Sequence, residues 1–268
     1  MEWKKITMSA GLVILSTLLI MGGFSESKAQ SIKSLDLSQP RIRDRIQASG
    51  YITSKPVPSW GKIIGSREGV ANLIEGEVVF IQLEPGKEVQ AGDRFSIVRL
   101  GKPVIHPVTR INLGTLVLMP GELVILERKD EVAVAKIHKS FIPVLPGDMI
   151  LPVQPILPEA ARIRTQKKME GVVVFSPEDT VTISEKEFVF IDLGSQDGVI
   201  VGDLFSIYQK PVRPRGVYGE PKEDAKQIPM VRVGEVVVVS VQPETSTALV
   251  TRSLQPIYIG DLAVSGME

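Results

Sequence analysis

The segment EVQAGDRFSIVR, residues 88–99, decides how this chain is organised, because GVIVGDLFSIYQ repeats its pattern at residues 198–209. Aligned without a gap, Gly61–Ile97 and Gly171–Ile207 share 15 of 37 residues. A catalytic motif seldom needs a second copy, whereas a duplicated folding unit repeats its turns and its core. The two segments therefore indicate an internal duplication.

The duplication resumes after a shift of three residues. Gly121–Ile150 and Gly234–Ala263 share nine of 30 residues, including a Gly-Asp pair near the end of each segment. The repeated unit is about 95 residues long, whereas solenoids use shorter repeats in larger numbers. Two tandem domains are therefore expected.

Both copies are predicted to be all-β. Short segments rich in Val, Ile and Phe alternate with Gly, Pro and Asp, as in strands separated by tight turns. Examples are EVVFIQL at 77–83 and VAVAKIHKS at 132–140 in the first copy, and EFVFIDL at 187–193 in the second. Roughly five to seven such strands per copy predict two small β-barrel or sandwich domains.

Four Gly-Asp pairs are interpreted as turns. Glycine adopts the positive φ that tight turns need, and aspartate accepts hydrogen bonds from the backbone of its own turn. A calcium loop places oxygen ligands at alternate residues, whereas the two aspartates of one copy lie about 55 residues apart. After the turns, Phe95, Ile97, Phe205 and Ile207 are expected to point into the cores. The pairs are Gly92-Asp93, Gly147-Asp148, Gly202-Asp203 and Gly260-Asp261.

The first 29 residues are predicted to be a cleaved signal peptide. Lys4 and Lys5 precede an apolar stretch of about 19 residues, and small residues precede a cut after Ala29. The alternative is an inner-membrane anchor at residues 6–24, because such a stretch can just span a bilayer. The chain has no cysteine, which excludes a lipid anchor on cysteine. A bacterial periplasm is the expected location.

Helical patterns lie outside the repeats. The candidates are Ser38–Ser49 and Leu157–Lys168, and the second is expected to be a short helical connector between the domains. The predicted boundaries are 1–29 for the signal peptide, 30–58 for an N-terminal extension, 59–153 for the first β domain, 154–168 for the linker and 169–268 for the second β domain.

Composition excludes several classes of function. Lysine plus arginine equals aspartate plus glutamate at 31 each, so no basic field favours nucleic acid. The absence of cysteine excludes thiolate catalysis and cysteine-based zinc sites. His106 and His138 are the two histidines, and each is expected to be a surface or loop residue without a functional partner. We predict no enzyme, with no catalytic residue, no cofactor and no metal site.

The candidate partner contacts lie in two irregular segments. Tyr51 and Trp60 precede the first copy, where they either pack this segment onto the domain or contact a partner. Gln209–Pro229 is rich in Pro, Gly and charge, so we expect an exposed loop, either solvated or in contact with a partner. Its candidate contacts are Arg213, Arg215 and Tyr218.

The elements GDRFSIVR, HPVT and the later Gly-Asp pair also carry a family resemblance. The chain resembles the region that follows the LysM module in bacterial LysM peptidoglycan-binding envelope proteins. It is more distantly similar to the C-terminal domain of the flagellar H-ring assembly protein. The resemblance covers Gly50–Pro152 and, more weakly, Gly171–Ala263, and it implies an exported, non-enzymatic envelope protein. The LysM module itself is absent, so no site residues of the family are carried over.

The expected function is a non-catalytic, exported scaffold or interaction protein of the cell envelope, associated with peptidoglycan or a larger envelope assembly. Its partner would be an envelope protein or peptidoglycan, not nucleic acid, with membrane contact only through an uncleaved N-terminal segment. One alternative is direct binding of peptidoglycan or another polysaccharide. An envelope hydrolase is a second alternative, which a cleft with two close carboxylates would support.

Overall fold

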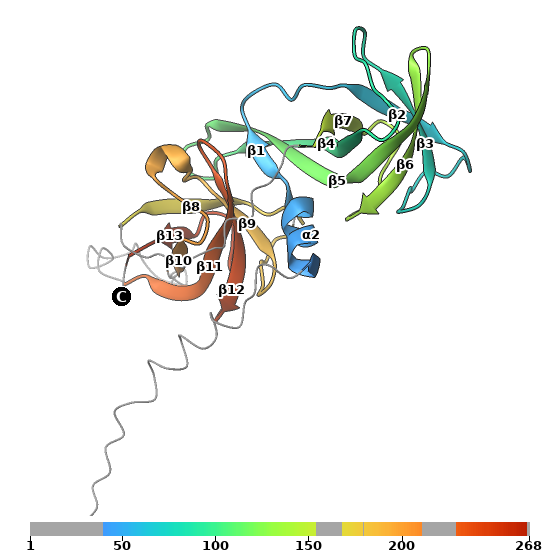
Figure 1. Cartoon of the computed structure of the whole chain (residues 1–268). Helices are drawn as coiled ribbons and strands as arrows, with labels where there is room; N and C mark the ends of the chain where they lie inside the picture. The colour runs from blue at the N-terminus through green and yellow to red at the C-terminus, as the bar shows by residue number, and fades with distance from the viewer. Residues whose placement is uncertain (1–39, 154–167, 179, 211–228, 267–268) are drawn as a thin grey trace, which may run out of the picture. The chain divides into compact units, whose positions relative to one another are not determined.

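The computed structural model describes residues 40–153, 168–178, 180–210 and 229–266 (Figure 1). All described residues belong to one compact unit, Leu37–Glu268. Nearly all regular structure in the described residues is β-strand. The structure therefore confirms the predicted all-β class.

The first copy folds into a ring of six antiparallel strands, here called barrel 1. Each strand pairs with two neighbours in the order β4-β5-β6-β3-β2-β7, and β7 returns to β4. The strands are β2 (Gly61–Ser66), β3 (Val78–Leu83), β4 (Arg94–Ile105), β5 (Asn112–Lys129), β6 (Val132–Ser140) and β7 (Met149–Pro152).

The second copy, barrel 2, closes in the equivalent order β10-β11-β12-β9-β8-β13. A 3₁₀ turn, η1 (Ser195–Asp197), follows β9. The two rings confirm a pair of small β domains of the same topology. The strands are β8 (Glu170–Phe175), β9 (Phe188–Ile191), β10 (Leu204–Gln209), β11 (Val231–Val241), β12 (Ser246–Ser253) and β13 (Leu262–Val264).

The register of the strands is the same in both barrels. Phe95 pairs with Leu123 in barrel 1, and the corresponding Phe205 pairs with Val236 in barrel 2. Even the irregularity in β2 after Ile63 recurs in β8 after Val173. Since a one-residue slip would turn every side chain to the other face, both copies direct the same positions inward.

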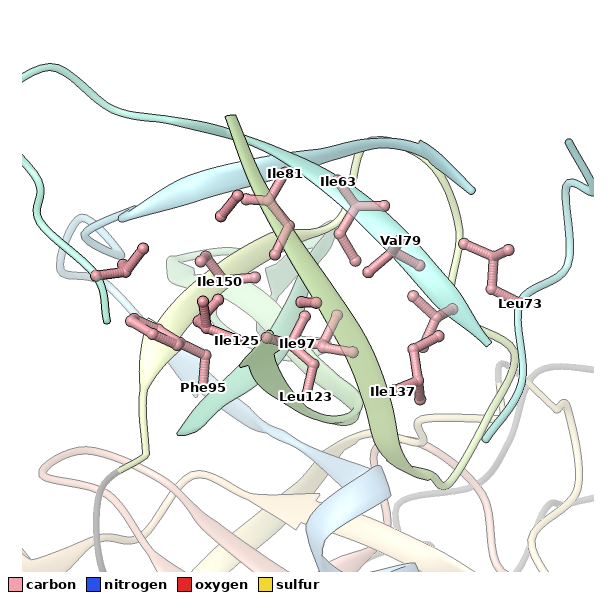
Figure 2. Packing of buried hydrophobic residues seen from close by; sticks show 14 of the residues in the cluster. Ile63, Leu73, Val79, Ile81, Phe95, Ile97, Leu123, Ile125, Ile137 and Ile150 are labelled. Atoms are coloured by element: carbon pink, nitrogen blue, oxygen red, sulfur yellow. The ribbon is translucent and has the colours of Figure 1, made fainter. Parts of the chain in front are cut away.

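Each barrel encloses its own hydrophobic core. Figure 2 shows the core of barrel 1, where Ile81, Phe95 and Ile97 converge with residues from the other strands. Phe205 and Ile207 are buried at the equivalent positions of barrel 2. The predicted inward direction of these four residues after the Gly-Asp turns is therefore confirmed.

The Gly-Asp pairs form the predicted turns. Their glycines have φ between 95° and 102°. In each turn the aspartate carboxylate accepts a hydrogen bond from the backbone N–H three residues earlier, at 2.8–3.0 Å. Glu77 and Glu187 act in the same way, accepting from Ile74 N–H and Ser184 N–H at 2.7 Å. Both glutamates therefore help to close a turn.

The N-terminal extension contributes one helix and one strand. The helix α2 (Pro40–Ser49) confirms the helix predicted at Ser38–Ser49, and β1 (Tyr51–Thr53) pairs with β5. The second predicted helix and the predicted signal peptide or anchor lie outside the described residues. Within the described ranges, no helix is long and apolar enough to cross a membrane.

Two strands of barrel 1 continue beyond the ring and form an arm. The pairing of β4 with β7 stops at Val98, yet β4 and β5 stay paired out to Ile105 and Asn112. With β1 alongside β5, this extension has three strands and is here called the arm. In barrel 2, β10 ends at Gln209, and residues 211–228 lie outside the described chain.

Candidate functional site

The arm of barrel 1 contacts barrel 2 within the compact unit. Ile52, Val104 and Leu116 of the arm form one buried cluster with Val174 and Phe190 of barrel 2. Burying apolar surface of this kind stabilises a contact by about 25 cal/mol per Å². The outer surface of β8 and β9 therefore serves as a docking face as well as a barrel wall.

His106, at the turn of the arm, makes the polar contact with this face. Its Nε2 lies 2.9 Å from Asp192 Oδ2, and its Nδ1 accepts hydrogen bonds from Val108 N–H and Thr109 N–H, both at 3.1 Å. Because Nδ1 acts as an acceptor, the ring proton is assigned to Nε2, which donates to Asp192. His106 lies in the loop between β4 and β5, as expected, but it is 6% exposed and contacts Asp192, so the expectation that it has no partner is wrong.

Asp192 is held by a second hydrogen bond. Its Oδ1 accepts from Val172 N–H, which leaves Oδ2 directed to the histidine. At the edge of the contact, Thr247 Oγ1 donates to the Gly50 carbonyl at 3.3 Å. The covered face of barrel 2 thus has an apolar centre and a satisfied polar edge. It consists of Val174, Phe175, Phe190, Asp192 and Thr247.

Barrel 1 presents the same positions without such a cover in the described part of the chain. Ile64 is 54% exposed, whereas its equivalent Val174 is 1% exposed. Phe80 is partly buried, whereas its equivalent Phe190 is completely buried. We call these positions the open face: Ile64, Gly65, Phe80, Gln82 and Val134. Ile64 and Gln82 are exposed, Gly65 stands where barrel 2 has Phe175, and Val134 is buried at 8% exposure.

A groove of about 530 Å³ adjoins the open face. Ile64 and Gln82 belong to both, and Lys62, Lys87, Arg128 and Glu131 add charged groups to the groove. A single exposed apolar side chain is common on protein surfaces, so the choice of this site rests on the contrast between exposed Ile64 and its buried equivalent Val174. The open face with this groove is the candidate functional site.

The groove does not combine a buried carboxyl group with an exposed one. Glu84 and Glu131 are its two carboxylates, and both are exposed. A glycosidase needs one carboxyl that burial keeps protonated near neutral pH. Among the described residues, no group of three His, Asp or Glu side chains could hold a metal ion.

Of the predicted partner contacts, Trp60 and Tyr51 lie in the described chain, and neither lines the groove. Trp60 packs on the core of barrel 1, with its ring centroid 5.5 Å from that of Phe95. Lys87 Nζ lies 5.0 Å from the centroid of the Trp60 ring. Tyr51 lies in β1, where desolvation raises the pKa of its hydroxyl above the ordinary value. Arg213, Arg215 and Tyr218 lie outside the described residues.

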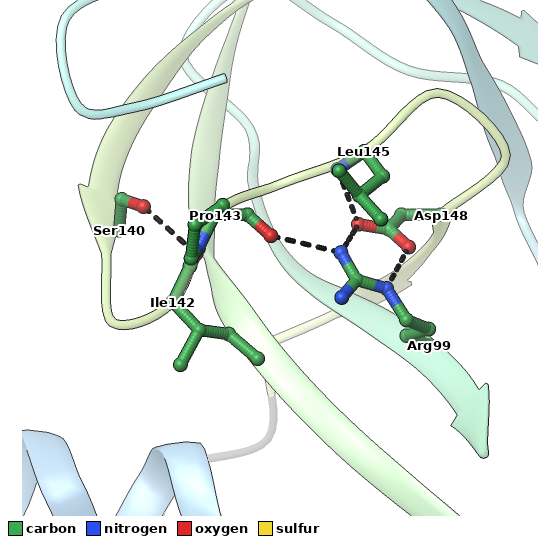
Figure 3. Close-up of polar contacts among 6 residues, drawn as sticks. All are labelled: Arg99, Ser140, Ile142, Pro143, Leu145 and Asp148. Carbon is green, nitrogen blue, oxygen red and sulfur yellow. Dashed lines mark hydrogen bonds and ion pairs between the residues drawn. The ribbon is translucent and has the colours of Figure 1, made fainter. Parts of the chain in front are cut away.

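The base of the arm differs between the barrels. In Figure 3, the Arg99 guanidinium binds Asp148 through Nε at 2.7 Å and Nη2 at 2.8 Å, and Nη2 also donates to the Pro143 carbonyl. Barrel 2 places Gln209 opposite Asp261 instead, at 3.3 Å from both carboxylate oxygens. Desolvation raises the pKa of Asp261, although hydrogen bonds from Tyr258 N–H and Gln209 lower it in part.

One pattern in the sequence could have indicated the covered face and the open face. The segments VVFI in β3 and FVFI in β9 are apolar at every position, so they do not alternate as a strand with one wet face does. Continuous apolar runs are typical of strands that are covered on both faces. Phe80 and Phe190 occupy the outward position in these runs.

The chain was compared with models of known protein families and with curated protein sequences. No model of a known protein family matches it, and no curated protein sequence matches it. A proposal about the function of the chain therefore has to rest on the geometry of the open face.

Proposed function

We propose that this chain is a non-catalytic, exported interaction protein of the bacterial cell envelope, whose first barrel binds a protein partner. One observation carries the proposal. Barrel 2 buries its outer apolar face beneath the arm, whereas barrel 1 exposes Ile64 at the equivalent position. Because Val174 packs against another segment of protein, we expect its equivalent Ile64 to pack against protein as well.

The envelope location rests on the N-terminal sequence. Lys4 and Lys5, the apolar stretch and the small residues up to Ala29 follow the pattern of an export signal. Direct binding of a glycan is less well supported, because exposed aromatic rings usually form the stacking platforms for sugars. Trp60 packs on a core, and neither Trp60 nor Tyr51 lines the groove.

The proposal is tested with a photocrosslinking amino acid at position 64 in living cells. We expect a protein adduct that contains this chain and is recovered from the periplasm after removal of residues 1–29. The control places the same amino acid at Val181, which is 82% exposed on barrel 2 and should give no adduct.

One result would contradict the protein partner, and a different result would contradict the envelope location. If position 64 forms no protein adduct and the protein sediments with purified peptidoglycan, then direct glycan binding replaces the proposal. Recovery of the chain from the cytoplasm would overturn the envelope location.

A further inference from the structure

We propose that the tip of the arm, residues 105–111, inserts into the surface of an anionic phospholipid membrane. The proposal goes beyond the function proposed above, because it does not depend on the open face or on its protein partner. It also adds a membrane contact to the one that the sequence predicts for an uncleaved N-terminal segment.

The first observation is the exposure of aliphatic side chains at the tip. Ile105, Val108 and Ile111 are 46%, 66% and 63% exposed. A single exposed aliphatic residue is ordinary on a protein surface, whereas a group of them marks a surface that contacts a protein or a membrane. The arm thus ends in an apolar tip, although farther back it buries Val104 and Leu116 against barrel 2.

The second observation is that the backbone N–H groups of the turn are satisfied within the turn. His106 N–H donates to the Ile111 carbonyl at 2.8 Å, and Arg110 N–H donates to the His106 carbonyl at 3.0 Å. The N–H groups of residues 108 and 109 both donate to His106 Nδ1 at 3.1 Å, and Pro107 has no N–H. Because the apolar part of a bilayer has no water to accept hydrogen bonds, a segment that enters it has to satisfy its own donors. Residues 106–110 meet this condition.

The third observation is the charge of the arm. The chain has no aspartate or glutamate between Asp93 and Glu122, a stretch that contains the whole of the β4–β5 hairpin beyond the ring. Arg110 is exposed in the turn, and Lys55 is exposed just after β1, the strand that borders β5 in the arm. Aliphatic side chains beside cations match a bilayer whose headgroups are negative.

Asp192 of barrel 2 is the carboxylate that contacts the tip. Its Oδ2 receives the proton of His106, and its Oδ1 accepts from Val172 N–H. The side chain is 21% exposed, so its repulsion of anionic headgroups is reduced by both burial and hydrogen bonding. The same histidine therefore satisfies the turn with one ring nitrogen and the carboxylate with the other.

The shape of the tip favours a membrane over a protein as the partner. A bilayer accepts aliphatic side chains from the end of a hairpin without a matching pocket, whereas a protein would have to supply one. The turn is also held by its internal hydrogen bonds before it binds, so little conformational entropy is lost on insertion.

The test uses a single labelled cysteine, because the chain has none of its own. Residues 30–268 keep the described compact unit and omit the apolar N-terminal stretch, and Val108→Cys carries the environment-sensitive fluorophore NBD. We expect its emission to shift to shorter wavelength with vesicles of phosphatidylglycerol and phosphatidylcholine, but not with phosphatidylcholine alone. The control is Val181→Cys, which labels a side chain 82% exposed on barrel 2 and should give no shift with either vesicle.

Cosedimentation with the same vesicles measures the two parts of the contact in unlabelled protein. Ile111→Asp should weaken binding to the anionic vesicles at least about tenfold, because it places a carboxylate in the apolar layer. Arg110→Asn should weaken it about fivefold through the loss of one charge. Asparagine tolerates the positive φ of 63° at this position. Val181→Asp should bind as the wild type does, and thermal unfolding identifies any variant that does not fold, which Val108→Asp then replaces.

Unchanged emission of the label at position 108 with both kinds of vesicle overturns the proposal. Equal binding to neutral and anionic vesicles also overturns it, since the cations of the tip would then have no effect. If a photocrosslinking amino acid at position 108 forms a protein adduct and no vesicle binds, the tip is a protein contact instead. These results are separate from the adduct expected at position 64, so the proposed function and this inference can fail independently.

Discussion

The two barrels share their ring order, their register and their turns, yet the same outward position has a different environment in each. Phe190 is completely buried beneath the arm, whereas Phe80 stays partly exposed. The fold of a barrel therefore fixes the direction of a side chain. Whether an outward side chain is buried depends on a segment from outside that barrel.

The largest expected effect is at this pair of phenylalanines. Phe190→Ala removes a fully buried ring and should lower the free energy of unfolding by about 3–5 kcal/mol. Phe80→Ala should cost less, about 1–2 kcal/mol, because part of the ring is already in water. Urea unfolding of both variants measures the difference. Equal losses would show that the cover of the arm does not make Phe190 contribute more to stability than partly buried Phe80.

The next effect concerns the polar contact of the arm. Asp192→Asn leaves one carbonyl oxygen for two donors, Val172 N–H and His106 Nε2–H, and should lower the free energy of unfolding by about 1–3 kcal/mol. The matched change Gln82→Asp in barrel 1 should be nearly neutral, since Gln82 is exposed. Thermal unfolding of the two variants is the measurement, and a neutral Asp192→Asn would contradict the assigned hydrogen bonds.

A smaller effect is expected at the base of the arm. Arg99→Gln gives barrel 1 the pairing that barrel 2 has, and it removes two charge-assisted hydrogen bonds to Asp148. We expect a loss of about 1–2 kcal/mol in urea unfolding, because the arginine side chain is partly exposed and solvent screens the pair. Arg99→Lys keeps the charge but not the two-pronged geometry, so it should fall between the wild type and Arg99→Gln.

The smallest effect is a pH dependence at Asp261. Since desolvation raises its pKa in the folded state, the folded chain binds more protons than the unfolded chain just above the ordinary aspartate value of 3.8. The contribution of Asp261 to stability is therefore present at low pH and declines as the pH rises through the folded pKa. The stability of Asp261→Asn relative to the wild type should increase between about pH 3.5 and 7. A flat or falling difference would contradict this sign.

The sequence was sufficient to predict the barrels because their determinants are local. The Gly-Asp turns and the alternating strands specify where each strand begins and which side chains point inward. The arm was missed because its segment LGKPVIHPVTRINLG, with two glycines and two prolines, is typical of a loop. Its strands depend on partners far along the chain, such as β1 and barrel 2. The role of His106 was missed for the same reason, since Asp192 is 86 residues away.

The direction of the arm has a consequence for the order of synthesis. The ribosome adds Leu116 to the chain before Phe190. The apolar side of the arm is therefore synthesised before the residues of barrel 2 that cover it. At about 5–20 residues per second, the interval of about 70 residues lasts roughly 4–15 s. During that time the nascent chain carries an uncovered apolar surface, and a chaperone that binds such surfaces would have its greatest effect on this interval.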